Sequence, residues 1–203
     1  MKTASVLASV AGLAIAGAAM AQGGNLEKDY SREHVPPLPL ADNVGGVNGV
    51  TTSTIVVTDV GLIDTFDYVF IDISHTWVGD LIVQLEHGNN VVRLINRPGS
   101  VSGSFGSSSD LAGVYTFVPG GPAMQTASTP AIVPPGQYGP FDSFEAFHGK
   151  PKEGEWTLRI IDHAGGDTGV LRAWGFGVTN VPTPGAAALL GLGGLVAARR
   201  RRA

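Results

Sequence analysis

Alternation of apolar and polar side chains dominates the middle of the chain and predicts short β-strands. In residues 67–74 the apolar side chains of Val69, Ile71 and Ile73 fall on every second position. Since successive side chains of a strand point to opposite faces, these three residues share one face that can be buried. The same two-residue period returns in residues 81–86, 156–160 and 174–178. Each of these segments is therefore predicted to be a strand with one core-facing side.

Turn residues separate these strands. The sequence His87-Gly88-Asn89-Asn90 is typical of a tight turn, and residues 91–96 follow it as the second strand of a hairpin. The 29 Gly and 13 Pro among 203 residues interrupt the chain too often for a helical bundle. The sequence predicts an all-β protein, an antiparallel β-sandwich with Greek-key or jelly-roll wiring over residues 50–180.

The N-terminal segment, residues 1–21, has the features of a secretory signal peptide. Lys2 precedes an apolar stretch of small residues, and Ala19-Met20-Ala21 supplies a cleavage pattern. The mature chain is then expected to begin at Gln22. Residues 22–49 are polar and Pro-rich and are predicted to form an extended lead-in to the domain.

The C-terminal segment, residues 181–203, has three parts. Pro182-Thr183-Pro184 precedes an apolar run, residues 186–198, and four arginines follow. As a helix, the 13-residue run is about 20 Å long, against about 30 Å for a bilayer core. This arrangement resembles the PEP-CTERM sorting signal of Gram-negative bacteria, with Thr183 where that signal usually has Glu. The resemblance implies a sorting and processing enzyme as partner. It also implies that the protein lies at the cell surface, at the outer membrane or outside the cell, and that its apolar segment is inserted in the membrane before processing. The alternative is an ordinary tail anchor.

The composition of the chain limits the kinds of functional site that it can form. The chain has no cysteine, which excludes disulfides, thiolate nucleophiles and Cys-ligated metals. Five of the 13 Lys and Arg lie in the two terminal segments, so eight remain against all 17 Asp and Glu, a net charge of −9. Such an acidic domain lacks the basic patch that nucleic acid requires and is a reasonable candidate for Ca²⁺.

Three motifs go beyond a generic sandwich: H-T-W-V-G-D-L at residues 75–81, G-E-W-T-L at 154–158, and D-H-A-G-G-D-T-G-V-L at 162–171, closed by Trp174. Together they resemble the P domain, also called Homo B, which follows the catalytic domain of kexin- and furin-like proteases. The resemblance covers residues 54–180 and implies a galactose-binding-like jelly roll with an accessory role. The motif residues that carry it are His75, Thr76, Gly79, Asp80, Trp156, Gly166, Gly169 and Trp174.

The motifs also make sense as structure alone. Gly79 permits a tight turn, and the carboxylate of Asp80 can accept hydrogen bonds from backbone amides there. Trp156 and Trp174 are in phase with the apolar positions of their strands, so both are expected in the core.

No catalytic motif accompanies the resemblance. The sequence has no G-x-S-x-G elbow, no G-T-S-type serine elbow and no H-E-x-x-H. His75 and His163 are expected to be turn residues more than metal ligands. Glu153 and Glu155 imitate a glycosidase pair, but two residues apart at the entry to a strand they are expected to be solvated charges. The protein is therefore predicted not to be an enzyme.

Calcium is the cofactor that the sequence favours. Asp80, Asp162 and Asp167 are loop carboxylates beside glycines, and hard oxygen ligands of this kind suit Ca²⁺. The alternative is that these aspartates only cap turns.

Taken together, the sequence predicts an exported, non-catalytic surface or matrix protein with a binding or structural role. Two alternatives stay open: an accessory partner of a separately encoded, secreted subtilisin-like protease, and a lectin-like sugar-binding domain. Extracellular polysaccharide is a further candidate partner.

Overall fold

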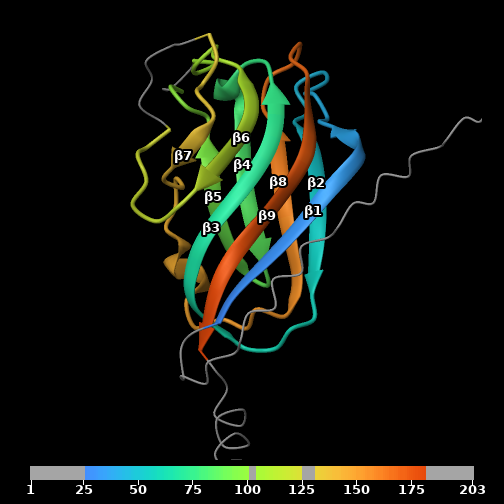
Figure 1. The fold of residues 1–203 in the computed structure, drawn as a ribbon. Helices are drawn as coiled ribbons and strands as arrows, with labels where there is room; N and C mark the ends of the chain where they lie inside the picture. The colour runs from blue at the N-terminus through green and yellow to red at the C-terminus, as the bar shows by residue number, and fades with distance from the viewer. Residues whose placement is uncertain (1–25, 101–103, 125–130, 182–203) are drawn as a thin grey trace, which may run out of the picture.

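The computed structural model describes residues 26–100, 104–124 and 131–181 (Figure 1). The predicted signal peptide and the sorting tail beyond Val181 lie outside the described residues. Within the described part of the chain, no helix is long and apolar enough to cross a bilayer.

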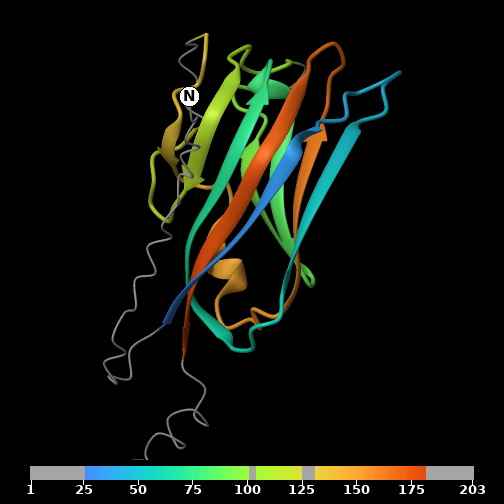
Figure 2. The same cartoon turned by 45° about the vertical axis from the view of Figure 1, so that its right-hand side comes forward.

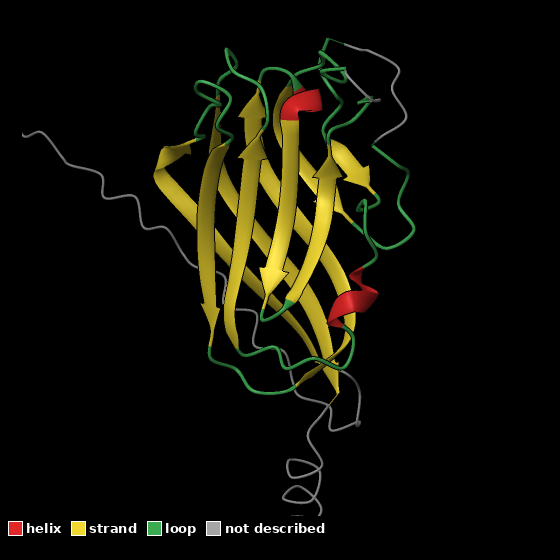
Figure 3. Ribbon diagram, turned by 180° about the vertical axis from the view of Figure 1, so that it is seen from behind, coloured by secondary structure: helices red, strands yellow, loops and turns green. Residues whose placement is uncertain are grey.

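Two sheets pack face to face, which confirms the all-β sandwich (Figures 1 and 3). The five-stranded sheet has the order β1 (Leu26–Pro39), β9 (Gly169–Val181), β3 (Leu62–His75), β6 (Leu111–Phe117) and β7 (Gly136–Tyr138). The four-stranded sheet has the order β2 (Gly49–Val57), β8 (Gly154–Asp162), β4 (Leu81–His87) and β5 (Asn90–Asn96). Two 3₁₀ helices, η1 (Val78–Asp80) and η2 (Phe144–Phe147), complete the elements.

The chain passes from one sheet to the other at most connections, which is jelly-roll wiring. Strands β1, β2, β3 and β4 alternate between the two sheets. Two connections stay within one sheet, β4–β5 and β6–β7. The first is the hairpin predicted from the turn at His87, and in it His87 pairs with Asn90. All named strand pairs are antiparallel except β6 with β7. Figure 2 shows the two layers and places η2 near their lower end.

The predicted lead-in contains an edge strand. Its residues 26–39 are extended and pair with β9, from Leu26 opposite Asn180 to Pro39 opposite Val170. Tyr30 of this strand packs against Phe176 with ring centroids 5.2 Å apart. The polar, charged sequence of β1 gave little sign of this pairing, because an edge strand needs only one partner and one buried face.

Aromatic rings fill the space between the sheets. Trp156 and Trp174 are fully buried, and Phe66, Trp156 and Phe176 are mutually in contact, with centroid distances from 4.6 to 5.7 Å. The polar edges of both indoles are satisfied: Trp156 Nε1 donates to the Lys152 carbonyl at 2.8 Å and Trp174 Nε1 to Ser53 Oγ at 2.7 Å. This packing holds the two sheets in one alignment, so the same strand ends lie together at each end of the sandwich.

Candidate functional site

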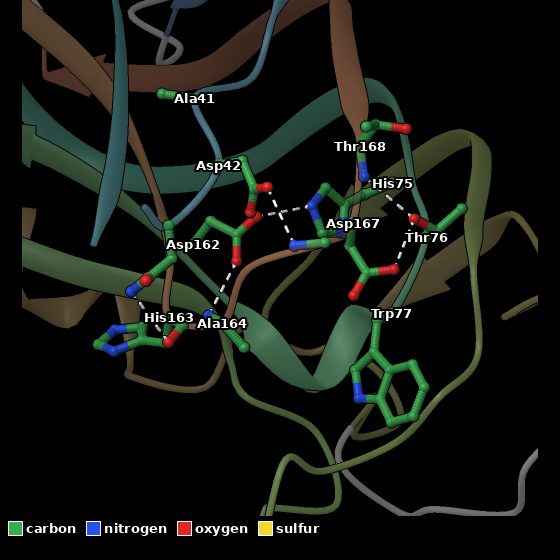
Figure 4. A network of polar contacts seen from close by, with 12 residues as sticks. Ala41, Asp42, His75, Thr76, Trp77, Asp162, His163, Ala164, Asp167 and Thr168 are labelled. Atoms are coloured by element: carbon green, nitrogen blue, oxygen red, sulfur yellow. Dashed lines mark hydrogen bonds and ion pairs between the residues drawn. The ribbon is translucent and has the colours of Figure 1, made fainter. Parts of the chain in front are cut away.

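The three predicted carboxylates gather at one end of the sandwich, although they come from distant parts of the chain. Asp162 is the last residue of β8, Asp80 the last residue of η1, and Asp167 lies between β8 and β9. Strand pairing brings the first two together, because Leu81 is opposite Asp162 and the backbone N–H of His163 donates to the Asp80 carbonyl at 3.0 Å. We call Asp42, Asp80, Asp162 and Asp167 the Asp cluster; Figure 4 shows Asp42, Asp162 and Asp167 with their partners.

His75 and Asp162 form a buried pair in this cluster. His75 Nε2 lies 3.1 Å from Asp162 Oδ2, and their side chains are only 1% and 2% exposed. The other oxygen, Oδ1, accepts from the Ala164 backbone N–H at 3.2 Å. Burial raises the pKa of Asp162, and the bonds from Ala164 and His75 offset part of that rise.

Asp167 joins the start of β9 to the end of β3. Thr76 Oγ1 donates to Asp167 Oδ1 at 2.8 Å and accepts from the Thr168 N–H at 3.1 Å. The Thr76 N–H in turn donates to the Thr168 carbonyl at 3.1 Å. This carboxylate therefore organises a turn, as the capping alternative predicts.

Asp80 is the carboxylate of the cluster whose ionised form has the least favourable surroundings. The residue is 1% exposed, and its Oδ1 has no hydrogen-bond partner in the described structure. Burial, followed by repulsion from Asp162 and Asp167, raises the pKa of Asp80 to about 6; Arg97 and His75 act in the opposite direction. The backbone holds it in place: a Cβ on the preceding Gly79 would lie 2.5 Å from the Phe105 carbonyl oxygen, so that position accepts only glycine without rearrangement.

Sequence reasoning missed a fourth carboxylate, Asp42. It follows β1 in what was predicted to be only a lead-in, and its Oδ2 accepts from the Gly166 N–H at 3.0 Å. Its Oδ1 is buried and has no hydrogen-bond partner among the described residues, and its charge raises the pKa of Asp162. The one local signal was an Asp-Asn pair shortly before two glycines, which is typical of a turn and does not reveal a partner 124 positions away.

The fit of this cluster to a cation is partial. The two buried, unpartnered oxygens of Asp42 and Asp80 are groups that a cation would satisfy. Asp162 already uses both oxygens, and Asp167 uses one. Among the described residues, no three or more Asp, Glu or His side chains stand ready to hold a metal ion together. The carboxylates interact electrostatically, but they do not form a finished ligand shell.

The histidines do not complete a hydrolase triad in the described structure. His75 pairs with Asp162, while its Nδ1 has no partner. A different histidine, His34, pairs with a serine: its Nε2 lies 2.9 Å from Ser53 Oγ. Ser53 is buried between the sheets and already receives the Trp174 indole N–H. The His–Asp and His–Ser pairs are therefore separate, and the serine is not placed to attack a substrate.

The other residues singled out in the sequence are either packed within the structure or exposed to solvent. Burial lowers the pKa of His163, whose Nε2 has no hydrogen-bond partner in the described structure. Glu153 and Glu155 are exposed. Gly169 lies so close to Ser74 and His75 that a Cβ would overlap them, and Gly166 has a φ of 108°.

Comparison with known proteins identifies part of this architecture. The proprotein convertase P-domain family model matches residues 135–178. That segment holds the G-E-W-T-L and the D-H-A-G-G-D-T-G-V-L motifs, so the resemblance to the P domain is confirmed there.

Two curated relatives align with the chain. Proteins named calcium-dependent protease from Trichormus variabilis and from a Nostoc species are 32% and 33% identical over 109 residues. The alignment covers 52% of this chain but only 12% of each relative.

Among solved structures, the serine protease of Aeromonas sobria is similar. In complex with a chaperone it gives 13% identity and a TM-score of 0.41 over 78% of this chain and 27% of that one. The protease alone gives 14% identity and a TM-score of 0.40 over 83% and 29%.

Proposed function

We propose that the protein is an exported, non-catalytic P-domain protein that acts as a binding or structural module at the cell surface or in the extracellular matrix. The observation that carries the proposal is the match of residues 135–178 to the P-domain model. The separation of the His75–Asp162 and His34–Ser53 pairs supports the non-catalytic part. The sequences of residues 1–21 and 181–203 support export and sorting.

An accessory role beside a protease is the alternative within the same proposal. Both curated relatives are named proteases, and this chain aligns with only 12% of their length. A chain that shares that segment, and whose described residues form no triad, is suited to supply packing to a separately encoded subtilisin-like protease rather than chemistry.

Labelling and capture experiments test both parts. The protein purified after export should not react with a fluorophosphonate serine probe and should cleave no casein. Stoichiometric labelling of any serine would contradict the non-catalytic proposal. Capture of a secreted serine protease from the culture medium by the immobilised protein, absent with an unrelated exported β-sandwich, would favour the accessory role.

Calcium binding at the Asp cluster is a second candidate function. The relatives' name, calcium-dependent protease, supports it, as do the oxygens of Asp42 and Asp80 that have no partner in the described structure. The residues that would hold the ion are Asp42, Asp80, Asp162 and Asp167, with Asp80 the carboxylate that gains most from a positive charge. The Ca²⁺ would neutralise carboxylate repulsion and so stabilise the folded state.

A further inference from the structure

A second site lies at the end of the sandwich opposite the Asp cluster, where β3 begins. A pocket of about 520 Å³ opens there between the first residues of β3, the turns around β7 and the helix η2. Such a volume is in the range of small-ligand sites. Its walls combine aromatic rings with polar groups and turn backbone. The lining side chains include those of Phe66, Phe141, Phe144, Glu145 and His148.

Two rings make the floor of this pocket. Phe66 and Phe144 are buried, and their rings stack with centroids 4.6 Å apart and an angle of 27° between planes. Both belong to the packed core, so the floor is rigid.

The third ring, Phe141, is 44% exposed and yet fixed. Its backbone N–H donates to the Leu94 carbonyl at 3.2 Å. The Arg93 guanidinium carbon lies 4.6 Å from the ring centroid, and Asp142 holds that guanidinium through bonds of 2.8 and 3.0 Å. A half-exposed ring held in this way offers a preorganised apolar surface to a ligand.

The polar groups around the rings are rich in hydrogen-bond acceptors. His148 Nδ1 lies 2.6 Å from the Asp64 carbonyl oxygen. Since a carbonyl can only accept, Nδ1 carries the proton, and in the neutral ring Nε2 is left as an acceptor. The exposed carboxylate of Glu145 adds two acceptor oxygens. A ligand for this pocket should therefore bring hydrogen-bond donors.

The charges around the pocket restrict the class of ligand further. The carboxylates of Asp64 and Glu145 and the net charge of −9 between the terminal segments disfavour an anion. The Arg93 guanidinium already occupies one face of Phe141, so a second cation on that ring would be repelled. A prolyl ring would stack but brings no N–H donor. A neutral ring with an apolar face and a rim of hydroxyl donors meets every condition.

We propose that this pocket binds a sugar ring of a neutral polysaccharide, which stacks on Phe141 and donates hydroxyl hydrogen bonds to Glu145 and His148. The proposal specifies a ligand class for the proposed surface-binding role. It is independent of the activity test, because a reactive serine would contradict the proposed function and leave this pocket as it is.

Affinity electrophoresis tests the pocket. The protein purified after export is run in native gels that contain dextran, galactomannan or xyloglucan, with alginate as the anionic comparison. We expect retardation by at least one neutral polysaccharide and none by alginate. Phe141→Ala should weaken that binding by about tenfold or more, whereas Phe141→Tyr should keep it. Val56→Ala is the control, because it removes an exposed apolar side chain on β2, outside the pocket.

Several outcomes would overturn the proposal. One is the absence of retardation by all three neutral polysaccharides. Another is equal retardation of the wild type and Phe141→Ala, with unchanged melting temperatures as proof of folding. Phe141-dependent binding of choline or of a polyproline peptide, without polysaccharide binding, would assign the pocket to a different ligand.

Discussion

At the residue scale, Asp80 combines a buried carboxylate with an unpartnered oxygen and two negative neighbours, Asp162 and Asp167. Its pKa of about 6 lies above the value of about 3.8 for a free Asp. The folded state therefore binds more protons than the unfolded state between pH 4 and pH 6, and stability falls as pH rises through this window. Above pH 6 the full cost, at most about 3 kcal/mol, is present.

Asp80→Asn should remove this cost without changing the size of the side chain. We expect the variant to show a smaller decline in stability between pH 4 and pH 6, because only Asp162 then keeps a raised pKa in the cluster, and, without Ca²⁺, to be more stable than the wild type at pH 7. Urea unfolding at several pH values with EDTA measures both effects. Glu33→Gln, at an exposed site on β1, should leave the profile as it is. A profile in Asp80→Asn that falls as steeply as that of the wild type would assign the titration to another group.

Calcium should act on the same residues with the opposite sign. For a Kd of about 10⁻⁴ M, typical of extracellular modules, 10 mM Ca²⁺ adds about 2.7 kcal/mol to stability. We expect a clear rise in melting temperature for the wild type and none for Asp80→Asn or Asp167→Ala. An equal rise with Mg²⁺, or an undiminished rise in both variants, would reduce the effect to charge screening and leave these aspartates as turn caps.

The tryptophans should differ in their contribution to stability. Trp156 is fully buried, its ring stacks on His87 with centroids 3.9 Å apart, and its N–H is bonded to Lys152. Trp156→Ala should cost about 3–5 kcal/mol in urea unfolding. Trp77 is partly exposed and adopts a left-handed backbone with a φ of 76°, so Trp77→Ala should cost clearly less. Equal losses would show that the partly exposed Trp77 ring contributes as much to the core as the buried Trp156 ring.

At the scale of the element, β9 is a central strand with two glycines in its interior, and glycines weaken strands in general. Gly175 and Gly177 stand opposite Phe70 and Tyr68 of β3. A Cβ at Gly175 would lie 2.6 Å from Phe70 Cε1 and 2.9 Å from Ser31 Cβ. Because Gly175 and Gly177 lack side chains, the rings of Phe70 and Tyr68 can lie close over β9. For the same reason β1 can approach β9 along its other edge.

Gly175→Ala should therefore destabilise the sandwich by about 1–3 kcal/mol, although alanine is the better strand former. The reverse change two residues away, Ala173→Gly, should cost only about 0.5–1 kcal/mol. Thermal unfolding of both variants makes the comparison. A neutral or stabilising Gly175→Ala would mean that β1 and Phe70 can shift at little cost.

At the scale of the whole molecule, the sandwich has two distinct ends. Leu26 pairs with Asn180, and Leu62 with Val181, so the first and last described residues lie together at the end where β3 begins. The Asp cluster lies at the other end, where His75 pairs with Gly169. A molecule held by its C-terminal segment would present the Asp cluster away from the point of attachment.

Deletion of residues 182–203 should release the protein into the medium, because the proposed sorting role assigns membrane retention to the apolar run and the arginines. Fractionation of cells and medium with an antibody to the domain measures the release. A variant with the four terminal arginines changed to glutamine separates the role of the charge from that of the apolar run. Equal cell association of the deleted and full chains would contradict the sorting proposal.

The sequence by itself determined the class of fold and the identity of most residues at the Asp cluster. A period of two at Val69, Ile71 and Ile73 is a local consequence of strand geometry, so it can be read without the partner strand. The motif aspartates and the buried tryptophans could be named for a similar reason, since turn chemistry and burial leave local patterns.

Only the tertiary structure decided what depends on contacts between distant segments. The pairing of β1 with β9, the place of Asp42 beside Gly166 and the pocket around Phe141 each join residues far apart in the chain. The electrostatics of Asp80 belong to the same category, because its pKa follows from burial and from the charges of Asp162 and Asp167, more than 80 positions away. Local sequence specifies what a segment can do, whereas desolvation and Coulomb interactions depend on distances that exist only after the two sheets have packed.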